Sequence, residues 1–78
     1  MSRTITIYSP PWSCVQCNAT YRWLDSRGIE YTVMDSTDLE NNLAIKVLGY
    51  LQAPVVFIDD EHTSGFNPIW LSEQLDPS

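Results

Sequence analysis

Residues 4–17 read TITIYSPPWSCVQC, an alternating β-branched run followed by two prolines and a cysteine pair. The run Thr4–Tyr8 is typical of a strand. Residues 9–11 (Ser-Pro-Pro) end it, because proline can neither donate a ladder hydrogen bond nor continue a helix. Cys14 and Cys17 are the only cysteines of the chain and follow directly. This order of strand, tight loop and cysteine pair decides the interpretation of the rest of the sequence.

The segment after the prolines predicts a helix from about residue 14 to residue 27. Ser13 is a suitable N-cap, and Gly28 stands where glycine commonly ends a helix. Cys17, Thr20 and Leu24 recur at the spacing of one buried helix face. Cys14 would then lie at the positive end of the helix dipole, which favours a thiolate, with Cys17 one turn further in and facing the core.

The remaining elements follow from the same kind of pattern. Residues 29–34 predict a second strand, and Thr37 with Glu40 matches a capping box for a second helix that ends at Gly49. The apolar stripe of that helix comprises Leu39, Leu43, Val47 and Leu48. A third strand (Val55–Ile58), a turn (Asp59-Asp60), a short fourth strand (61–63) and a last helix (68–75, with Asn67 as cap and Pro68 in the first turn) complete the chain.

The predicted order is βαβ, then α, then ββα. A βαβ unit requires a parallel strand pair with a right-handed crossover, and a hairpin requires an antiparallel pair. We therefore expect an α/β fold with a mixed four-stranded sheet and helices on both faces. At 78 residues the chain is expected to form one domain, residues 1–78.

Charge and hydropathy exclude several classes of protein. Ten acidic residues against four basic ones give a net charge of −6, which argues against nucleic-acid and anionic-membrane partners. No apolar run approaches the ~20 residues of a membrane span. Strand-like sequence begins at Thr4, too early for a signal peptide. We expect a cytoplasmic protein, where a cysteine pair is more often catalytic or metal-binding than structural.

The cysteine pair itself predicts thiol–disulfide exchange, with Cys14 as the attacking thiolate and Cys17 as the thiol that resolves the mixed disulfide. One alternative is a pair of buried, inert cysteines. Another is zinc, but structural zinc needs four ligands, and only His62 is a further strong candidate. A metal shared across a dimer stays open. We expect no metal site and no bound cofactor.

Pro54 is the second chemical feature. An Ala53-Pro54 step before a buried strand suits a cis peptide, which would present the backbone of Ala53 to an extended partner beside the cysteines. The alternative is a trans proline at the start of a strand.

Other conspicuous residues have simpler interpretations. Trp12 is either an exposed aromatic that contacts partner proteins or a lid on Phe66. His62 is expected to be structural or on the surface, with a proton shuttle as the alternative. Trp23 and Trp70 are expected to pack in the core. The acidic run Asp59-Asp60-Glu61 is expected to be a solvated turn rather than a metal site.

Three separated motifs resemble the glutaredoxin-like NrdH-redoxins. They are Cys14-Val15-Gln16-Cys17 with Asn18-Ala19-Thr20 and Leu24-Asp25, Leu48-Gly49-Tyr50-Leu51-Gln52-Ala53-Pro54-Val55-Val56, and Ser64-Gly65-Phe66-x-Pro68. The resemblance implies a thioredoxin fold of the compact glutaredoxin type, βαβαββα, with Pro54 cis. It implies a nucleophile at Cys14, a resolving thiol at Cys17 and a redox-active disulfide between them. The residues expected to contact the partner are Trp12, Val15, Gln16, Ala53, Pro54, Ser64, Gly65 and Phe66.

The resemblance further implies the direction of electron flow. The protein would donate electrons to the large subunit of class Ib ribonucleotide reductase and be recharged by thioredoxin reductase with NADPH. Apart from the resemblance, we expect this acidic chain to be a monomer. The alternatives are a general glutaredoxin that uses glutathione, and a non-enzymatic iron–sulfur carrier or binding module. Three positions depart from the family pattern: Ser9 replaces a frequent lysine, Thr63 an aromatic residue and Asn67 a basic one.

Overall fold

The computed structural model describes residues 4–12, 14–50 and 53–75, which form four strands and three helices. The elements in chain order are β1 (Ile5–Ser9), α1 (Val15–Ser26), β2 (Thr32–Asp35), α2 (Leu39–Val47), β3 (Val55–Ile58), β4 (Glu61–Ser64) and α3 (Pro68–Leu75). This is the predicted order.

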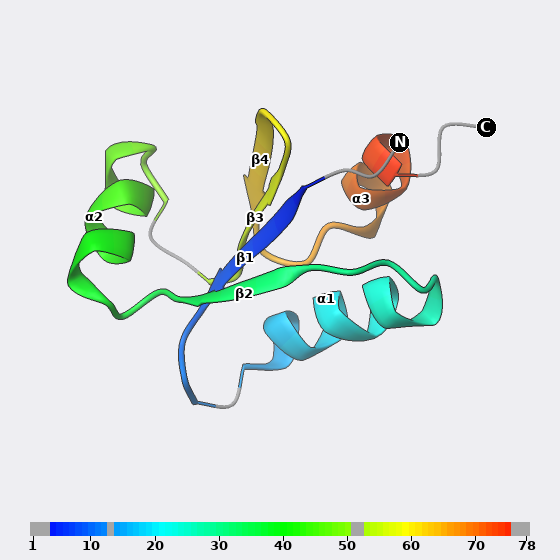
Figure 1. Ribbon diagram of the computed structural model, residues 1–78, viewed down its shortest axis with the longest axis horizontal. Helices are drawn as coiled ribbons and strands as arrows, with labels where there is room; N and C mark the ends of the chain where they lie inside the picture. Colours follow the sequence, from blue (N-terminus) through cyan, green and yellow to red (C-terminus); the bar gives the residue numbers. More distant parts are fainter. Residues whose placement is uncertain (1–3, 13, 51–52, 76–78) are drawn as a thin grey trace.

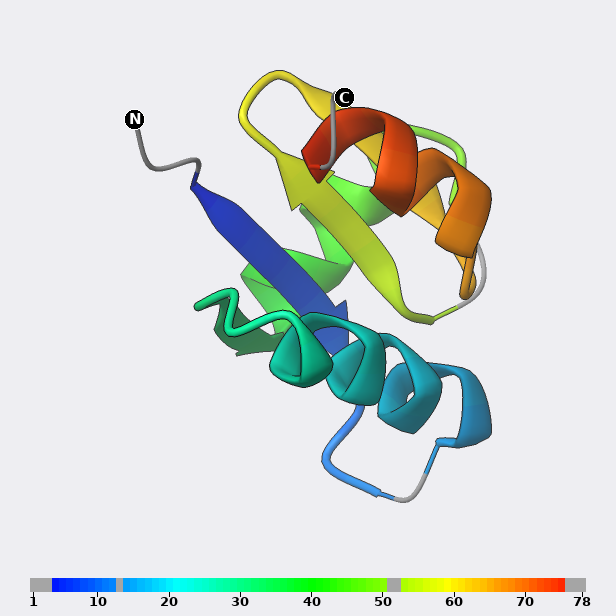
Figure 2. The ribbon, with the colours of Figure 1, turned by 90° about the vertical axis from the view of Figure 1, so that its right-hand side faces the viewer.

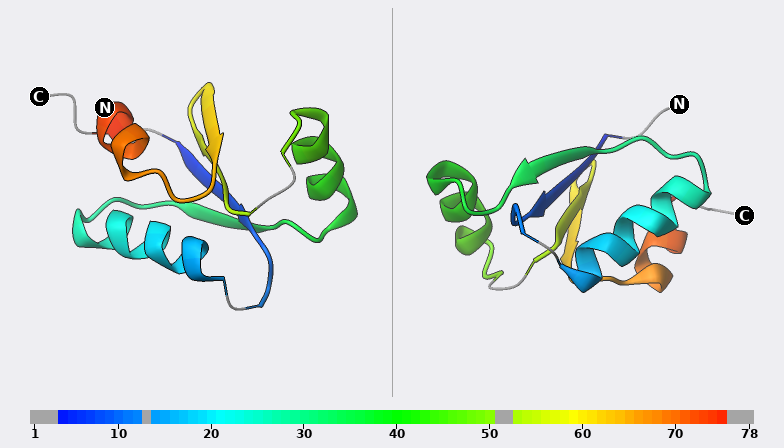
Figure 3. Two further views of the ribbon diagram at one scale, coloured as in Figure 1. Left: turned by 180° about the vertical axis from the view of Figure 1, so that it is seen from behind. Right: turned by 90° about the horizontal axis from the view of Figure 1, so that it is seen from below.

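The four strands form one mixed sheet in the order β2-β1-β3-β4. The pair β1–β2 is parallel, whereas β1–β3 and β3–β4 are antiparallel. Helices α1 and α3 lie side by side on one face of the sheet and α2 lies on the other (Figures 1 and 3). Figure 2 shows α1 and α3 in front of the sheet with α2 behind it. The architecture is the predicted thioredoxin fold of the glutaredoxin type.

The core lies between the sheet and the pair α1 and α3. The register places Ile5 opposite Ile58 and Ile7 opposite Val56, so that these four buried side chains share one face. Leu24 of α1 and Leu71 of α3 complete the cluster. Trp23 and Trp70 pack against it from the side, as predicted.

A core truncation is expected to be costly in a chain of this size. Leu24 is fully buried, so Leu24→Ala should lower the free energy of unfolding by about 3 kcal/mol. Val47, 85% exposed on α2, provides the matched control, and Val47→Ala should change it by less than about 0.5 kcal/mol. Urea titrations of the reduced proteins measure both values. Equal losses would mean that Leu24 is not part of a cooperative core.

The ends of α1 refine the prediction. Its N-cap is Cys14, not Ser13, which lies outside the described residues. The helix ends at Ser26 with Arg27 as C-cap, and Gly28 follows at φ 66°. The N–H of Ile29 donates to Leu24 O at 3.1 Å, which closes the helix end.

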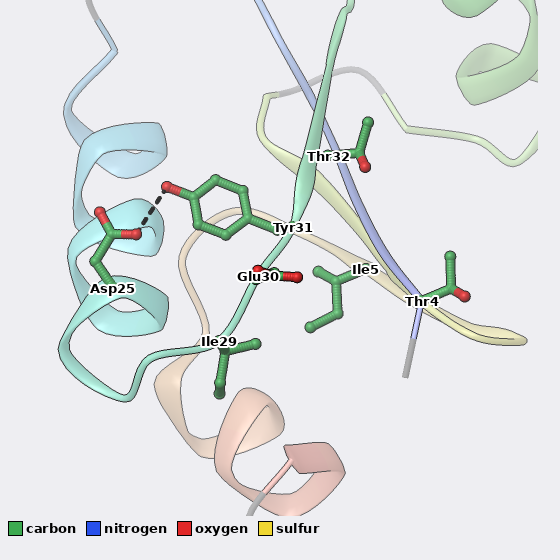
Figure 4. A pocket seen from close by; sticks show the side chains of 7 residues that line it. All are labelled: Thr4, Ile5, Asp25, Ile29, Glu30, Tyr31 and Thr32. Carbon is green, nitrogen blue, oxygen red and sulfur yellow. Dashed lines mark hydrogen bonds between the residues drawn. The ribbon is translucent and has the colours of Figure 1, made fainter. Parts of the chain in front are cut away.

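Strand β2 begins at Thr32 rather than at residue 29, because the preceding residues are held by α1. The ring of Tyr31 stacks on that of Tyr21 with centroids 5.5 Å apart, and its hydroxyl donates to Asp25 at 3.1 Å (Figure 4). Burial, and then Asp25, raises the pKa of Tyr31. A hollow of about 610 Å³ opens there, at the end of β1 opposite to the one that leads to Cys14.

Helix α2 presents a different face to the sheet from the one its apolar stripe suggests. The side chains of Asn41 and Asn42 donate to Asp35 O at 3.0 Å and Ser36 O at 3.2 Å, which fixes the rotation of the helix. Ile45 is its one buried residue. The stripe of Leu39, Leu43, Val47 and Leu48 is consequently exposed.

The predicted capping box of α2 is wrong. Asp38 is the N-cap and accepts the N–H of Glu40 at 3.1 Å. Thr37 is instead bonded to Asp35, which accepts both its N–H and its hydroxyl. These bonds account for the lowered pKa of Asp35.

Candidate functional site

Cys14 occupies the turn that carries the chain from β1 into α1. It has extended backbone angles (φ −142°, ψ 117°), and its Sγ accepts the N–H of Cys17 at 3.3 Å. Its carbonyl accepts the N–H of Asn18 at 2.9 Å. The sulfur therefore satisfies one of the free donors at the positive end of the helix while its residue stays partly exposed. A thiolate at this position would be stabilised and reachable.

Cys17 lies one turn further along α1 and is only 2% exposed. Burial, followed by the hydrogen bond and charge of Cys14, raises its pKa to about 12. Both cysteines are free, so this is the reduced dithiol form. Cys17 therefore keeps its proton at neutral pH.

No carboxylate or imidazole perturbs Cys17 among the described residues, and β1 carries no acid. The substrate sulfur that Cys17 displaces becomes a thiolate as the mixed disulfide breaks, and it can then accept the Cys17 proton. The geometry therefore supports a resolving step in which the Cys17 proton passes to the departing thiolate.

A pocket of about 430 Å³ opens beside Cys14 on the α2 side of the site. Its lining combines the active-site loop, the end of β2, α2 and the approach to β3: Pro10, Trp12, Cys14, Ser36, Thr37, Asn42, Ile45, Lys46, Tyr50 and Ala53. Trp12 is 66% exposed, which favours the docking interpretation over the buried lid. Ala53 shares the pocket with Cys14, as predicted.

Lys46, Asn42 and Tyr50 were missed from the sequence. Asn42 and Lys46 belong to α2, whose polar positions carried no motif, and Tyr50 follows the helix within the motif of residues 48–56 but was not assigned to the site.

The Ala53–Pro54 peptide is cis, as predicted. Pro54 is buried, and its carbonyl accepts the N–H of Gly65 at 2.7 Å. This bond places the segment after β4 beside Pro54. Two predicted site segments, residues 53–54 and 64–66, are thus brought together.

Segment 64–66 also contacts the cysteine turn. Phe66 packs against the core, and its N–H donates to Gln16 Oε1 at 3.1 Å. Gln16 is therefore engaged within the protein, whereas its neighbour Val15 is 84% exposed. Val15 is the residue of the cysteine turn that is most open to a partner.

Two features of the structure require a glycine at position 65. Its φ is +77°, and a Cβ there would lie 2.8 Å from Gln16 Oε1. Gly65→Ala should lower the free energy of unfolding by about 1–2 kcal/mol through the backbone conformation alone. It should lower it by about 1 kcal/mol more because the new Cβ pushes Gln16 away from Phe66. Gly28→Ala is the matched control, since Gly28 also has positive φ but nothing within 4 Å. Urea unfolding of both variants should give the larger loss for Gly65→Ala, and equal losses would contradict the contact.

The three departures from the family pattern each have a structural role here. Ser9 is buried and shares a hydrogen bond with the Tyr21 hydroxyl, so no charge stands at this position. Asn67 caps α3 by accepting the N–H of Trp70 at 3.1 Å, as predicted. Thr63 is partly buried in β4, opposite Val56.

His62 lies outside the cysteine site. It is exposed on β4, and its Nδ1 is 2.6 Å from the Tyr50 hydroxyl, in line with the structural interpretation. Asp59 and Asp60 form an exposed turn, and the exposed Glu61 begins β4. Among the described residues, no three His, Cys, Asp or Glu side chains lie close enough together to hold a metal ion.

Comparisons with known proteins agree with this geometry. The glutaredoxin family model matches residues 5–63. The glutaredoxin-like protein NrdH of Salmonella typhimurium is 42% identical over 67 residues, which are 83% of this chain and 80% of the relative. The chain belongs to the NrdH group of glutaredoxin-like proteins. It is accordingly a thiol–disulfide oxidoreductase.

Solved structures place the fold in the same family. The NrdH-redoxin of Escherichia coli superposes with a TM-score of 0.85 at 36% identity, over 96% of this chain and 97% of the other. A glutaredoxin of Archaeoglobus fulgidus superposes with a TM-score of 0.74 at 25% identity, over 95% and 87% of the two chains. Within the described residues, no helix has the length and hydropathy needed to cross a membrane.

Proposed function

We propose that this protein is the electron donor of a class Ib ribonucleotide reductase and is recharged by thioredoxin reductase with NADPH. The observation that carries the proposal is the arrangement of Cys14 at the helix N-terminus with Cys17 buried behind it, in a chain 42% identical to an NrdH protein. The Escherichia coli NrdH-redoxin is described as having a thioredoxin-like activity profile, which favours a thioredoxin-type reductase over glutathione. We place the protein in the cytoplasm, acting as a monomer.

The reaction proceeds in two exchanges. The Cys14 thiolate attacks one sulfur of the reductase disulfide, forms a mixed disulfide and releases the other sulfur as a thiolate. Cys17 then attacks Cys14 Sγ, and its proton passes to the reductase sulfur that leaves. Two electrons and the Cys17 proton reach the reductase, the sulfur released first takes its proton from solvent, and the Cys14–Cys17 disulfide remains. NADPH returns two electrons through the flavin of thioredoxin reductase.

Two structural features support this scheme: the exposed apolar side chains beside Cys14 and the charge of the residues around it. Trp12 and Val15 flank the nucleophile as exposed apolar side chains, which can anchor an extended protein segment. Ser9 is buried and uncharged, so position 9 supplies no cation for the carboxylates of glutathione, although Lys46 lines the pocket beside Cys14.

The test is NADPH consumption coupled to deoxyribonucleotide formation by a class Ib reductase. Each recharging system is supplied in turn, either thioredoxin reductase or glutathione with glutathione reductase. We expect turnover with thioredoxin reductase alone. Turnover only with glutathione would establish the general glutaredoxin instead, and absence of turnover with both would overturn the proposal.

A further inference from the structure

Three backbone donors between β4 and the first turn of α3 are bonded within the protein. The N–H of Gly65 donates to Pro54 O at 2.7 Å, and that of Phe66 to Gln16 Oε1 at 3.1 Å. The N–H of Trp70, in the first turn of α3, donates to Asn67 Oδ1. Backbone donors at a glycine turn before a helix are a common binding site for anions. Here these three are already satisfied by the protein.

Of the acceptors of these three N–H groups, Gln16 Oε1 is the one that lies between the two cysteines. Gln16 is exposed and reaches a residue 50 positions away in the chain. Its Oε1 fills the space beside Gly65, only 2.8 Å from where a Cβ would stand. The start of α1 and the segment leading into α3 run side by side in Figure 3. A small disulfide that reacts at Cys14 would therefore meet Gln16 and the Phe66 N–H.

We infer that Gln16 determines specificity: by accepting the Phe66 N–H, it withholds that donor from the carboxylate of a small anionic disulfide. A protein disulfide does not depend on this donor, because it can bind through the exposed Trp12 and Val15. The net charge of −6 acts in the same direction, since it repels an anion. The inference rests on thiol–disulfide exchange at Cys14 and not on which reductase is the partner.

The experiment frees the donor and measures discrimination between two small disulfides. Glutathione disulfide carries carboxylates, and bis(2-hydroxyethyl) disulfide is uncharged. In both, Cys14 forms a mixed disulfide and releases a thiolate, so the ratio of their rate constants cancels the intrinsic reactivity of Cys14. Gln16→Ala should raise the rate constant for glutathione disulfide about tenfold relative to that for the uncharged disulfide, because a carboxylate can then accept the Phe66 N–H. The gain should shrink at high salt.

Two controls keep the test specific. Asn18→Ala alters an exposed residue in the same turn of α1 and should leave the ratio at the wild-type value. Gln16→Met has a neutral side chain of similar length that is at best a weak acceptor, and it should also raise the ratio. Hydrogen exchange should show the Phe66 amide protected in the wild type and less protected in both Gln16 variants.

Three results would overturn the inference. One is an unchanged ratio in Gln16→Ala although the Phe66 amide has lost its protection. Another is an equal rise for both disulfides, which would place the effect on Cys14 itself. The third is a Phe66 amide that exchanges freely in the wild type. None of these results depends on the ribonucleotide reductase assay, so the two proposals can fail separately.

Discussion

Cys14→Ser is expected to slow the reaction with a chromogenic aromatic disulfide by at least about a thousandfold, because a serine hydroxyl is hardly ionised and is a poor nucleophile towards sulfur. The structure assigns the first attack to Cys14, which is accessible and caps α1, whereas Cys17 is 2% exposed. The thiol that remains in Cys14→Ser is still buried, and burial, the main cause of the raised pKa of Cys17, keeps it protonated at neutral pH. It should not substitute for the lost nucleophile.

Cys17→Ser is the matched variant and should fail at the second step instead. Its first attack should keep a rate close to that of the wild type, but no thiol is present to displace the adduct. The wild type should release two thiols per protein, Cys17→Ser one, and Cys14→Ser almost none. Mass spectrometry should find a persistent mixed disulfide on Cys14 in Cys17→Ser alone. A fast Cys14→Ser and an inert Cys17→Ser would reverse the assignment.

The stability of the reduced protein is expected to fall as the pH rises from about 9 towards 12. The pKa of Cys17 rises from a model-peptide value of 9.0 to about 12 on folding, chiefly through burial. Below pH 9 both the folded and the unfolded chain hold the proton, so this group contributes no pH dependence. Above it the unfolded chain releases the proton while the folded chain retains it, and each unit of pH then favours unfolding by about 1.4 kcal/mol. The full loss is up to about 4 kcal/mol.

Tyrosine and lysine side chains titrate in the same range, so the measurement has to be a difference. Urea unfolding of the reduced wild type and of Cys17→Ala at several values between pH 8 and pH 11 provides it. The difference in the free energy of unfolding between the two proteins should become smaller as the pH rises, because only the wild type loses the contribution of Cys17. Parallel profiles would show that Cys17 ionises in the folded state as easily as in the unfolded chain.

The order of elements and the position of the cysteine pair could be read from local patterns. Alternation in residues 4–8, the glycine at position 28 and the proline at position 68 each act within a few residues, and the structure follows them, except that β1 begins at Ile5 and includes Ser9, which was expected to end it. The cis peptide before Pro54 was also foreseen from an X–Pro step ahead of a buried strand.

The errors arise where two local signals compete or where a distant group decides. Thr37 and Asp38 are both acceptable caps, and Asp38 prevails because Asp35 engages Thr37. The apolar stripe of α2 was the strongest signal in that helix, yet the hydrogen bonds of Asn41 and Asn42 to the end of β2 turn the helix the other way. The bond of Gln16 joins residues 50 positions apart, and no local pattern can show it.

The attachment of α2 has a consequence for how the protein accommodates a bulky partner. This helix is tied down by two asparagine side chains and one buried isoleucine, whereas α1 and α3 share the main core. Its backbone amides should therefore exchange with deuterium earlier than those of Leu24 or Leu71, through local opening that leaves the sheet intact. Ile45 and Lys46 line the pocket beside Cys14, so we expect this wall of the pocket to adjust to a docking protein more readily than the wall formed by α1.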